Sequence, residues 1–161
     1  MLNIRPVSDS DHDAVWSIVS PVIADGETYA LDRDLGRDAA LPHWIAPGKD
    51  TFVAVDEERI LGLYCITPIR SGGGSHVSNC GFVTAVEARG RGVARRMCEH
   101  AIEYARARGF RAMQFNFVVS TNEAAVHLWQ SLGLQIVGTL PGAFEHPKLG
   151  EVDAYVMYRR L

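Results

Sequence analysis

The sequence has few cysteines, no long apolar run and no excess of positive charge, and each absence excludes a class of protein. Its three cysteines, Cys65, Cys80 and Cys98, follow no C-x-x-C spacing. An odd number without that spacing favours buried reduced thiols over a disulfide framework or a zinc site, so no metal is expected. No apolar stretch approaches the ~20 residues that span a bilayer. The first residues also lack the apolar core of a signal peptide, so a cytoplasmic location is expected.

The net charge of the chain indicates which kinds of partner it can bind. Sixteen Lys and Arg residues against nineteen Asp and Glu residues leave a net charge of −3. A mildly acidic chain gains little from counterion release, which argues against nucleic acid as a partner. With 161 residues, of which 47% are apolar, the chain is long enough for one domain over residues 1–161. It contains no repeat or linker, and its short Gly/Ser cluster at 71–75 is interpreted as a loop.

Periodicity predicts that strands and helices alternate along the chain. Strands are expected at 2–6, 51–56, 60–68, 76–86, 111–119, 134–140 and 152–158. Helices are expected after Asp9 or Ser10, over 90–108, and from the cap Asn122 to Gly133. Within residues 24–48, the stretches 27–29 and 42–47 are expected to form a short helix and loops. Strands that precede and follow helices indicate an α/β or α+β sheet protein with at least one parallel pair.

Side-chain direction follows from the same periods. The first helix is expected to bury an i, i+3, i+4, i+7 stripe formed by Val15, Ile18, Val19 and Val22. Along 111–119, strict alternation predicts that Met113, Phe115 and Phe117 point one way and that Gln114 and Asn116 point the other. The segment 140–147, between the last two expected strands, is interpreted as a loop whose Phe144 and His146 can close over a ligand.

The most informative segment joins the strand at 76–86 to the helix at 90–108. Gly90 and Gly92 let backbone N–H groups approach an anion closely, and the helix N-terminus adds partial positive charge. Four arginines lie in this segment, at positions 89, 91, 95 and 96. Because the macrodipole disfavours cations at a helix start, their presence indicates an anionic ligand. A solvated, arginine-rich helix start is the alternative interpretation.

Two nucleotide-binding motifs are incomplete here. Gly90-x-Gly92 opens a dinucleotide fingerprint, but Arg95 stands where the third glycine belongs, and the next strand has no acidic residue for a ribose hydroxyl. The pattern GxxxxGK[ST] of a P-loop is absent. The anionic ligand is therefore of another kind.

Arg89-x-x-Gly92-x-Ala94 resembles the R/Q-x-x-G-x-G/A pyrophosphate loop of the GNAT superfamily of acetyl-CoA-dependent N-acetyltransferases. The stretch from Asn122 to Leu134 is similar to a second signature of that family, N-x-x-A-x-x-L-Y-x-x-x-G-F. The order of the expected elements also matches over nearly the whole chain. The resemblance implies a mixed central sheet of about six or seven strands, flanked by about four helices, with two central strands that splay apart.

The resemblance further implies acetyl-CoA as the cofactor and a set of residues that bind it. The strand carrying Phe82, Val83 and Thr84 would bond the pantetheine arm with its backbone. The turn and helix start would hold the pyrophosphate through Arg89, Arg91, Gly92, Val93, Ala94 and Arg95. Asn122 would contact the cofactor arm, or serve only as a helix cap. Trp129 stands where the family often has a tyrosine, and it is either a cofactor contact or an apolar core residue.

Acyl transfer from a thioester needs a neutral amine, a donor for the developing oxyanion and stabilisation of the departing thiolate. By analogy with the family, the backbone N–H of Val83 is the expected oxyanion donor. An indole N–H cannot deliver a proton, so Trp129 is not an ordinary general acid. The strand before the loop has no carboxylate, and Asn79 can only orient an amine, a carboxylate or a water. We therefore expect a water to deprotonate the amine.

The strands around Asn79 and Asn116 resemble those of the GNAT branch that acetylates azetidine-2-carboxylate and other proline analogues. That resemblance implies that both asparagines bind the acceptor, a small amine such as an amino or imino acid, in a ternary complex with the cofactor. A buried asparagine pair that only satisfies the splayed strands is the alternative. Glu27 and Tyr29 fall where the superfamily builds its acceptor wall. Arg5, Arg33 and Arg37 are further candidates for binding a carboxylate.

Two other functions remain compatible with these residues. A protein or peptide acceptor would need an open groove, whereas a small amino acid would fit a closed pocket. A non-catalytic CoA-binding sensor would explain the missing tyrosine and the missing strand carboxylate. A homodimer is implied only by its frequency in the superfamily.

Overall fold

The computed structural model describes all of residues 1–161. Its strands are β1 (Asn3–Pro6), β2 (Asp50–Asp56), β3 (Arg59–Pro68), β4 (Val77–Thr84), β5 (Ala112–Val119), β6 (Gln135–His146) and β7 (Gly150–Arg160). Its α-helices are α1 (His12–Asp25), α2 (Arg37–Ala40), α3 (Val93–Ala107) and α4 (Glu123–Ser131). Each predicted strand and helix outside residues 24–48 is present, whereas the short helix α2 lies between the two stretches, 27–29 and 42–47, for which a short helix and loops were expected. None of the helices is both long enough and apolar enough to cross a membrane.

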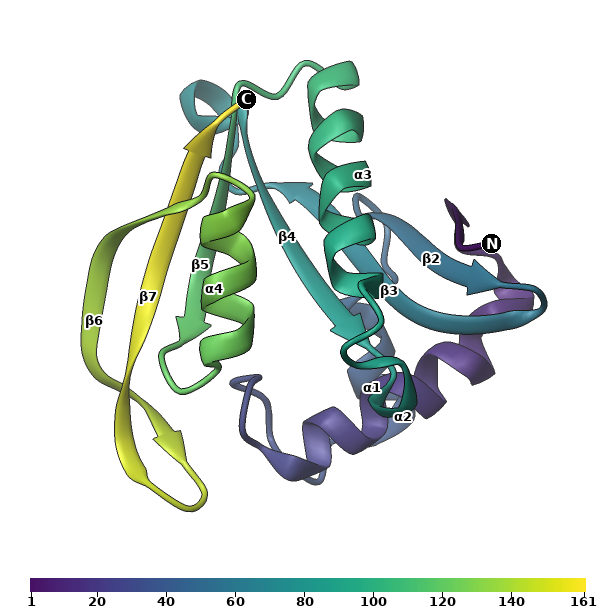
Figure 1. The fold of residues 1–161 in the computed structure, drawn as a ribbon, viewed down its shortest axis with the longest axis horizontal. Coiled ribbons are helices and arrows are strands. Elements are labelled where there is room, and N and C mark those ends of the chain that lie inside the picture. Colours follow the sequence, from purple (N-terminus) through teal and green to yellow (C-terminus); the bar gives the residue numbers. More distant parts are fainter.

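The seven strands form one sheet in the order β1-β2-β3-β4-β5-β7-β6 (Figure 1). All neighbours are antiparallel except β4 and β5, which are parallel. These two strands pair only where Val77 faces Ala112 and Ser78 faces Met113, and they diverge from there toward the C-terminal end of β4. The expected mixed sheet with splayed central strands is therefore confirmed.

Helices cover the sheet on both faces. α3 and α4 lie in front of the sheet in Figure 1, while α1 and the segment that leads to β2 lie behind it. The expected stripe of α1 is confirmed, since Val15, Ile18, Val19 and Val22 are all buried. α3 begins at Val93, three residues later than expected, because residues 90–92 form the preceding turn.

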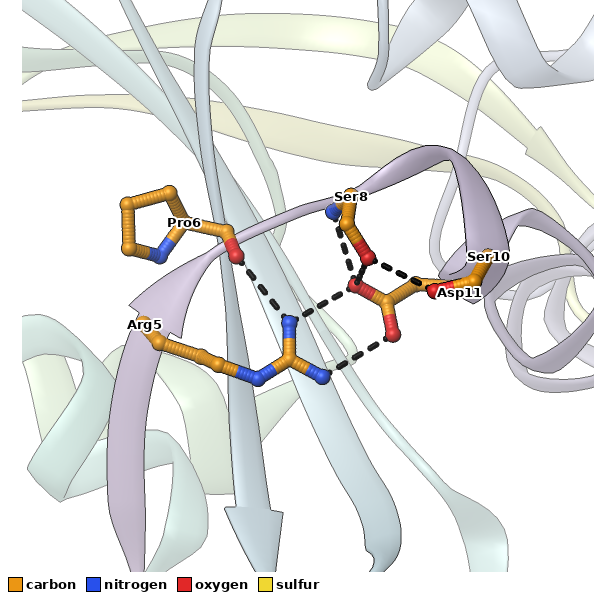
Figure 2. Close-up of polar contacts among 5 residues, drawn as sticks. All are labelled: Arg5, Pro6, Ser8, Ser10 and Asp11. Carbon is orange, nitrogen blue, oxygen red and sulfur yellow. Dashed lines mark hydrogen bonds and ion pairs between the residues drawn. The ribbon is translucent and has the colours of Figure 1, made fainter.

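The start of the first helical segment differs from the expectation. A 3-10 turn over Asp9–Asp11 precedes α1, and it is Ser8, rather than Asp9 or Ser10, that stands at its cap position. Figure 2 shows why: the Asp11 carboxylate accepts hydrogen bonds from the backbone N–H and the hydroxyl of Ser8. Arg5 completes the arrangement by donating to both carboxylate oxygens, at 2.7 and 2.9 Å. Tertiary contact with β1 thus decides where the helix begins.

Two expectations about the C-terminal half were wrong. In β5 the pairing with β7 shifts register between Phe115 and Val118, so the alternation breaks, and Phe117 is 36% exposed while Met113 and Phe115 are buried. β6 continues to His146, with a second register shift between Leu140 and Phe144. The segment expected as a loop is therefore mostly strand, and its irregularity at Pro141 and Gly142 lies within the β6–β7 hairpin.

Candidate active site

A cleft of about 880 Å³ follows the gap between β4 and β5. Its walls come from the segment after α1, from β4 and β5, from the turn before α3, and from α4. Of the residues predicted for the site, it brings together Glu27, Tyr29, Asn79, Phe82, Val83, Thr84, Arg89, Gly92, Val93, Ala94, Arg95, Asn116, Asn122 and Trp129. Arg91 is the predicted residue that does not line it.

The turn before α3 offers unpaired backbone donors. The first helical bond of α3 runs from Arg96 N–H to Gly92 C=O, so the N–H groups of Val93, Ala94 and Arg95 have no partner within the helix. Gly90 and Gly92 have φ of +74° and +78°, and no atom lies within 4 Å of the place where either would carry a Cβ. The backbone is thus open to a large anion, which fits the pyrophosphate of CoA.

Arg91 was expected to bind the pyrophosphate, but it does not line the cleft. Its backbone N–H donates to the Ala88 carbonyl at 3.3 Å, and its guanidinium lies 3.6 Å from the Asp56 carboxylate. Its amide is therefore occupied within the turn. Arg95 keeps its place at the cleft, where its guanidinium donates to the Ser131 hydroxyl at 2.8 Å and so ties α3 to α4.

The register of β4 decides which of its backbone groups face the gap. Ala85 N–H donates to Leu61 and Ile69 N–H donates to Val77, so odd-numbered residues of β4 bond toward β3. Val83, which lies opposite Leu63, shares this parity, and its N–H is directed toward β3 rather than the gap. The residues whose amides and carbonyls face the gap are Phe82 and Thr84. The N–H of Val83, the expected oxyanion donor, is therefore directed away from the gap, and the residues on either side of it, Phe82 and Thr84, face the gap instead.

Tyr29 enters the gap from the face opposite α3. Its hydroxyl donates a hydrogen bond to the Phe82 carbonyl, and its ring meets Trp44 edge-on at 5.5 Å. Burial raises the pKa of the Tyr29 phenol, so the group remains protonated at neutral pH. This places a neutral O–H group beside the backbone of the splayed strand.

Asn79 and Asn116 project to the same face of the sheet. Phe82 packs against Phe115 and Trp129 on the face of α3 and α4, so Asn79 and Gln114, with the opposite parity on their strands, face the other side. Asn116 lies on that side too, because its side chain is hydrogen-bonded to Gln114. Gln114 donates to the Asn116 Oδ1 at 3.0 Å, which leaves the Asn116 NH₂ group free. The Asn79 amide has no side-chain partner. Since no buried side-chain polar atom lacks a partner, the Asn79 amide faces the open cleft.

Trp129 and Asn122 belong to the opposite side of the gap. The Trp129 ring lies 5.0 Å from Phe82 and 5.2 Å from Phe115, and it is 7% exposed. Trp129 is thus a packed core residue that also forms part of the cleft wall. Asn122 occupies the N-cap position of α4 without a side-chain cap bond, which leaves its amide free for a ligand.

We call the side of the cleft formed by Tyr29, Trp44, Asn79 and Asn116 the acceptor side. Two segments far apart in sequence meet at its edge, where Glu27 Oε1 lies 2.6 Å from Lys148 Nζ. His146, close to Lys148, is 8% exposed and lines the cleft, and its Nδ1 accepts the Lys148 backbone N–H. With Nδ1 occupied in this way, His146 supports the turn. Phe144 packs beside it, with ring centroids 6.5 Å apart.

The arginines considered as carboxylate partners do not line the cleft. Arg5 is paired with Asp11 and Arg37 with Asp13, while the Arg33 guanidinium donates to the Ala24 carbonyl. Trp44 and Lys49, which were not expected at the site, do line the cleft. The available signal was their position: both lie in the turn that leads directly into the buried strand β2.

Comparison with known proteins agrees with this arrangement. Residues 17–134 match the acetyltransferase (GNAT) family. The N-acetyltransferase aca1 of Schizosaccharomyces pombe is 28% identical, with 81% of this chain and 71% of that protein covered. A GCN5-related N-acetyltransferase from Kribbella flavida is 44% identical, with a TM-score of 0.95 over 99% of this chain and 98% of that one.

A second solved structure contains the cofactor. yncA from Salmonella typhimurium, solved with its cofactor acetyl-CoA, has a TM-score of 0.86 at 22% identity, covering 100% of this chain and 94% of that one. The open turn before α3 and the splayed strands of this chain fit the same cosubstrate. The chain therefore belongs to the GNAT family, and its activity is acetyl-CoA-dependent N-acyl transfer.

Proposed function

We propose that this chain transfers the acetyl group to the amine of a small molecule, an amino or imino acid, by direct transfer in a ternary complex. The observation that carries the proposal is the Glu27–Lys148 ion pair, which joins the segment after α1 to the β6–β7 turn across the edge of the acceptor side. A peptide acceptor needs an open groove, and we expect this bridge to obstruct one.

Acetyl-CoA supplies an acetyl group activated as a thioester. The N–H groups of Val93, Ala94 and Arg95 would bind its pyrophosphate, and Asn122 would contact the cofactor arm. The backbone of Phe82 and Thr84 faces the gap and would hold the arm where a neighbouring strand would otherwise pair. One of these two amides would also stabilise negative charge on the reacting carbonyl oxygen.

The acceptor side supplies the remaining groups. The free NH₂ of Asn116 and the unpaired amide of Asn79 would orient the acceptor, in keeping with the resemblance to the branch that acts on proline analogues. Because β4 carries no carboxylate, a water would take the proton of the amine. The Tyr29 hydroxyl, kept protonated by burial, would turn from the Phe82 carbonyl to donate a hydrogen bond to the departing thiolate, which would take its proton from the water that deprotonated the amine.

The test is release of CoA thiol, measured with a panel of primary amines, amino acids, cyclic imino acids and short peptides. We expect turnover with amino or imino acids and little with peptides. Turnover confined to peptides would overturn the small-molecule proposal while keeping the fold and cofactor. Turnover confined to cyclic imino acids would identify the proline-analogue branch.

A further inference from the structure

The acceptor side contains a cation without a matching anion. Lys49 lines the cleft, and its ammonium donates one hydrogen bond, to the His43 carbonyl at 2.7 Å. No carboxylate lies within 4.0 Å of it. The adjacent Asp50 is engaged elsewhere, since its carboxylate accepts from the Tyr104 hydroxyl at 2.9 Å and lies 3.8 Å from Arg108.

We propose that Lys49 binds a carboxylate of the acceptor and thereby makes this enzyme selective for acceptors that carry an anionic group near the reacting amine. This inference rests on the proposed function, because it concerns the substrate class of the same site. The inference goes beyond the proposed function because it names one residue, Lys49, and its positive charge as the source of selectivity.

The position of Lys49 supports this role. Lys49 immediately precedes β2, whose first residue, Asp50, faces Ile66 on β3; the next residue of β3, Thr67, faces Asn79 on β4. Neighbouring strands are about 4.8 Å apart. Lys49 is therefore about two strand spacings from Asn79, a span that its flexible four-carbon side chain largely covers.

Lys49 lies next to the acceptor side of the sheet. Thr51, two residues after Lys49, donates to the Trp44 carbonyl at 2.6 Å. The Trp44 ring nitrogen in turn lies 4.0 Å from the place where Gly81 would carry a Cβ. Asn79 and Gly81, two residues apart on β4, share the face that Trp44 covers. Lys49 lies beside this face, because its ammonium donates to the carbonyl of His43, the residue before Trp44.

The charges around the cleft favour an anion at this place. The acidic residues that line it are Asp25 and Glu27. Glu27 is paired with Lys148, and Asp25 accepts the Glu27 backbone N–H at 3.0 Å. The Lys49 charge also acts on the cleft wall, where it opposes the rise that burial causes in the pKa of the Cys65 thiol. In a cleft partly shielded from water, an uncompensated ammonium attracts a carboxylate more strongly than it would on an exposed surface.

The experiment compares acids with their neutral carboxamides. For proline and alanine, and for prolinamide and alaninamide, kcat/KM is measured with wild-type protein, Lys49→Met, Lys49→Arg and the exposed control Arg106→Met. Because an amide also lowers the basicity of its amine, the quantity that matters is the change in the acid-to-amide ratio between variants. That change is independent of amine basicity.

We expect Lys49→Met to reduce the acid-to-amide ratio about tenfold or more, through a higher KM for the acid. Lys49→Arg should retain much of the ratio, Arg106→Met all of it, and the KM for acetyl-CoA should not change. Calorimetry of proline binding to the protein with CoA should show the same loss. An unchanged ratio in Lys49→Met would overturn the role of Lys49 even if small amines are acetylated. If no small amine is acetylated by wild-type protein, the proposed function fails first.

Discussion

Glu27 and Lys148, which are 121 residues apart in the sequence, form an ion pair of 2.6 Å that closes the edge of the acceptor side. The pair holds the pKa of Glu27 below its ordinary value and that of Lys148 above it, so both groups are charged at neutral pH. The contact sets the distance between the segment after α1 and the β6–β7 turn.

Breaking this pair should weaken acceptor binding. We expect Glu27→Gln to raise the acceptor KM roughly threefold, a modest effect because the pair is exposed to solvent. The KM for acetyl-CoA should stay the same. The double variant Glu27→Lys/Lys148→Glu restores the attraction and should recover most of the loss. Equal defects in the single and double variants would show that the ion pair is not the cause.

Gly92 offers a second test, because its φ of +78° is tolerated poorly by other residues and its surroundings are open. Gly109 at the end of α3 has a φ of +86° and equally open surroundings, far from the cleft, so it is a matched control. Both alanine variants should lose about 1 kcal/mol of stability. Only Gly92→Ala should raise the KM for acetyl-CoA. A similar rise in Gly109→Ala would mean that general destabilisation is responsible.

Tyr29 is expected to act through its hydroxyl. Tyr29→Phe keeps the ring against Trp44 but removes the O–H group, and we expect kcat to fall about 100-fold with little change in KM. Because burial raises the pKa of Tyr29 above its ordinary value near 10, the wild-type rate should show no loss from tyrosinate formation below about pH 10. A higher KM for acetyl-CoA with unchanged kcat would instead assign Tyr29 to cofactor binding.

Asn79→Ala removes the amide that faces the acceptor side while leaving the turn before α3 intact. Turnover should fall about tenfold, because the acceptor loses one orienting hydrogen bond. Acetyl-CoA binding, measured by calorimetry, should be unaffected. Normal turnover in this variant would remove Asn79 from the mechanism and favour a structural role.

Asp11 provides a prediction about stability. Its carboxylate is 6% exposed, and the hydrogen bonds from Arg5 and Ser8 hold its pKa well below the ordinary value. We expect Asp11→Asn to lower the free energy of unfolding by about 2 kcal/mol at pH 7, a value limited by the exposure of Arg5.

The pH dependence of that difference follows from the direction of the shift. A depressed pKa stabilises the folded state above the unfolded-state value of about 4, and this stabilisation is lost as the pH falls toward the folded-state value. Urea denaturation at several pH values should therefore give a constant difference between wild type and Asp11→Asn down to about pH 4, and a shrinking one below. A difference that grows on acidification would contradict the assignment.

Local patterns predicted most of the fold and one side of the cleft. Consecutive residues encode the turn with Gly90 and Gly92 and the helix after it. The part of the cleft that is expected to bind the cofactor could therefore be inferred from the sequence. The exposure of Phe117 could not, because it depends on a register shift against β7, a strand more than 30 residues away. The direction of the Val83 N–H could not be predicted either, because it depends on how β4 pairs with β3 and not on the residues next to Val83.

The acceptor side was less predictable for a related reason. Trp44 and Lys49 lie in a segment with no periodic pattern, and their place at the cleft results from the pairing of β2 with β3. Lys148 reaches Glu27 only because β6 and β7 form a long irregular hairpin. The groups of the acceptor side are therefore brought together by contacts between distant segments, which no local sequence pattern encodes.

The pairing of β4 with β5 at only two residue pairs divides the sheet into two halves, β1 to β4 and β5 to β7, that share hydrogen bonds at one end. A ligand in the gap supplies bonds that a continuous ladder would otherwise make. We expect the cosubstrate to bridge the two halves where β4 and β5 do not pair, and its binding to stiffen the sheet beyond Val77 and Ser78.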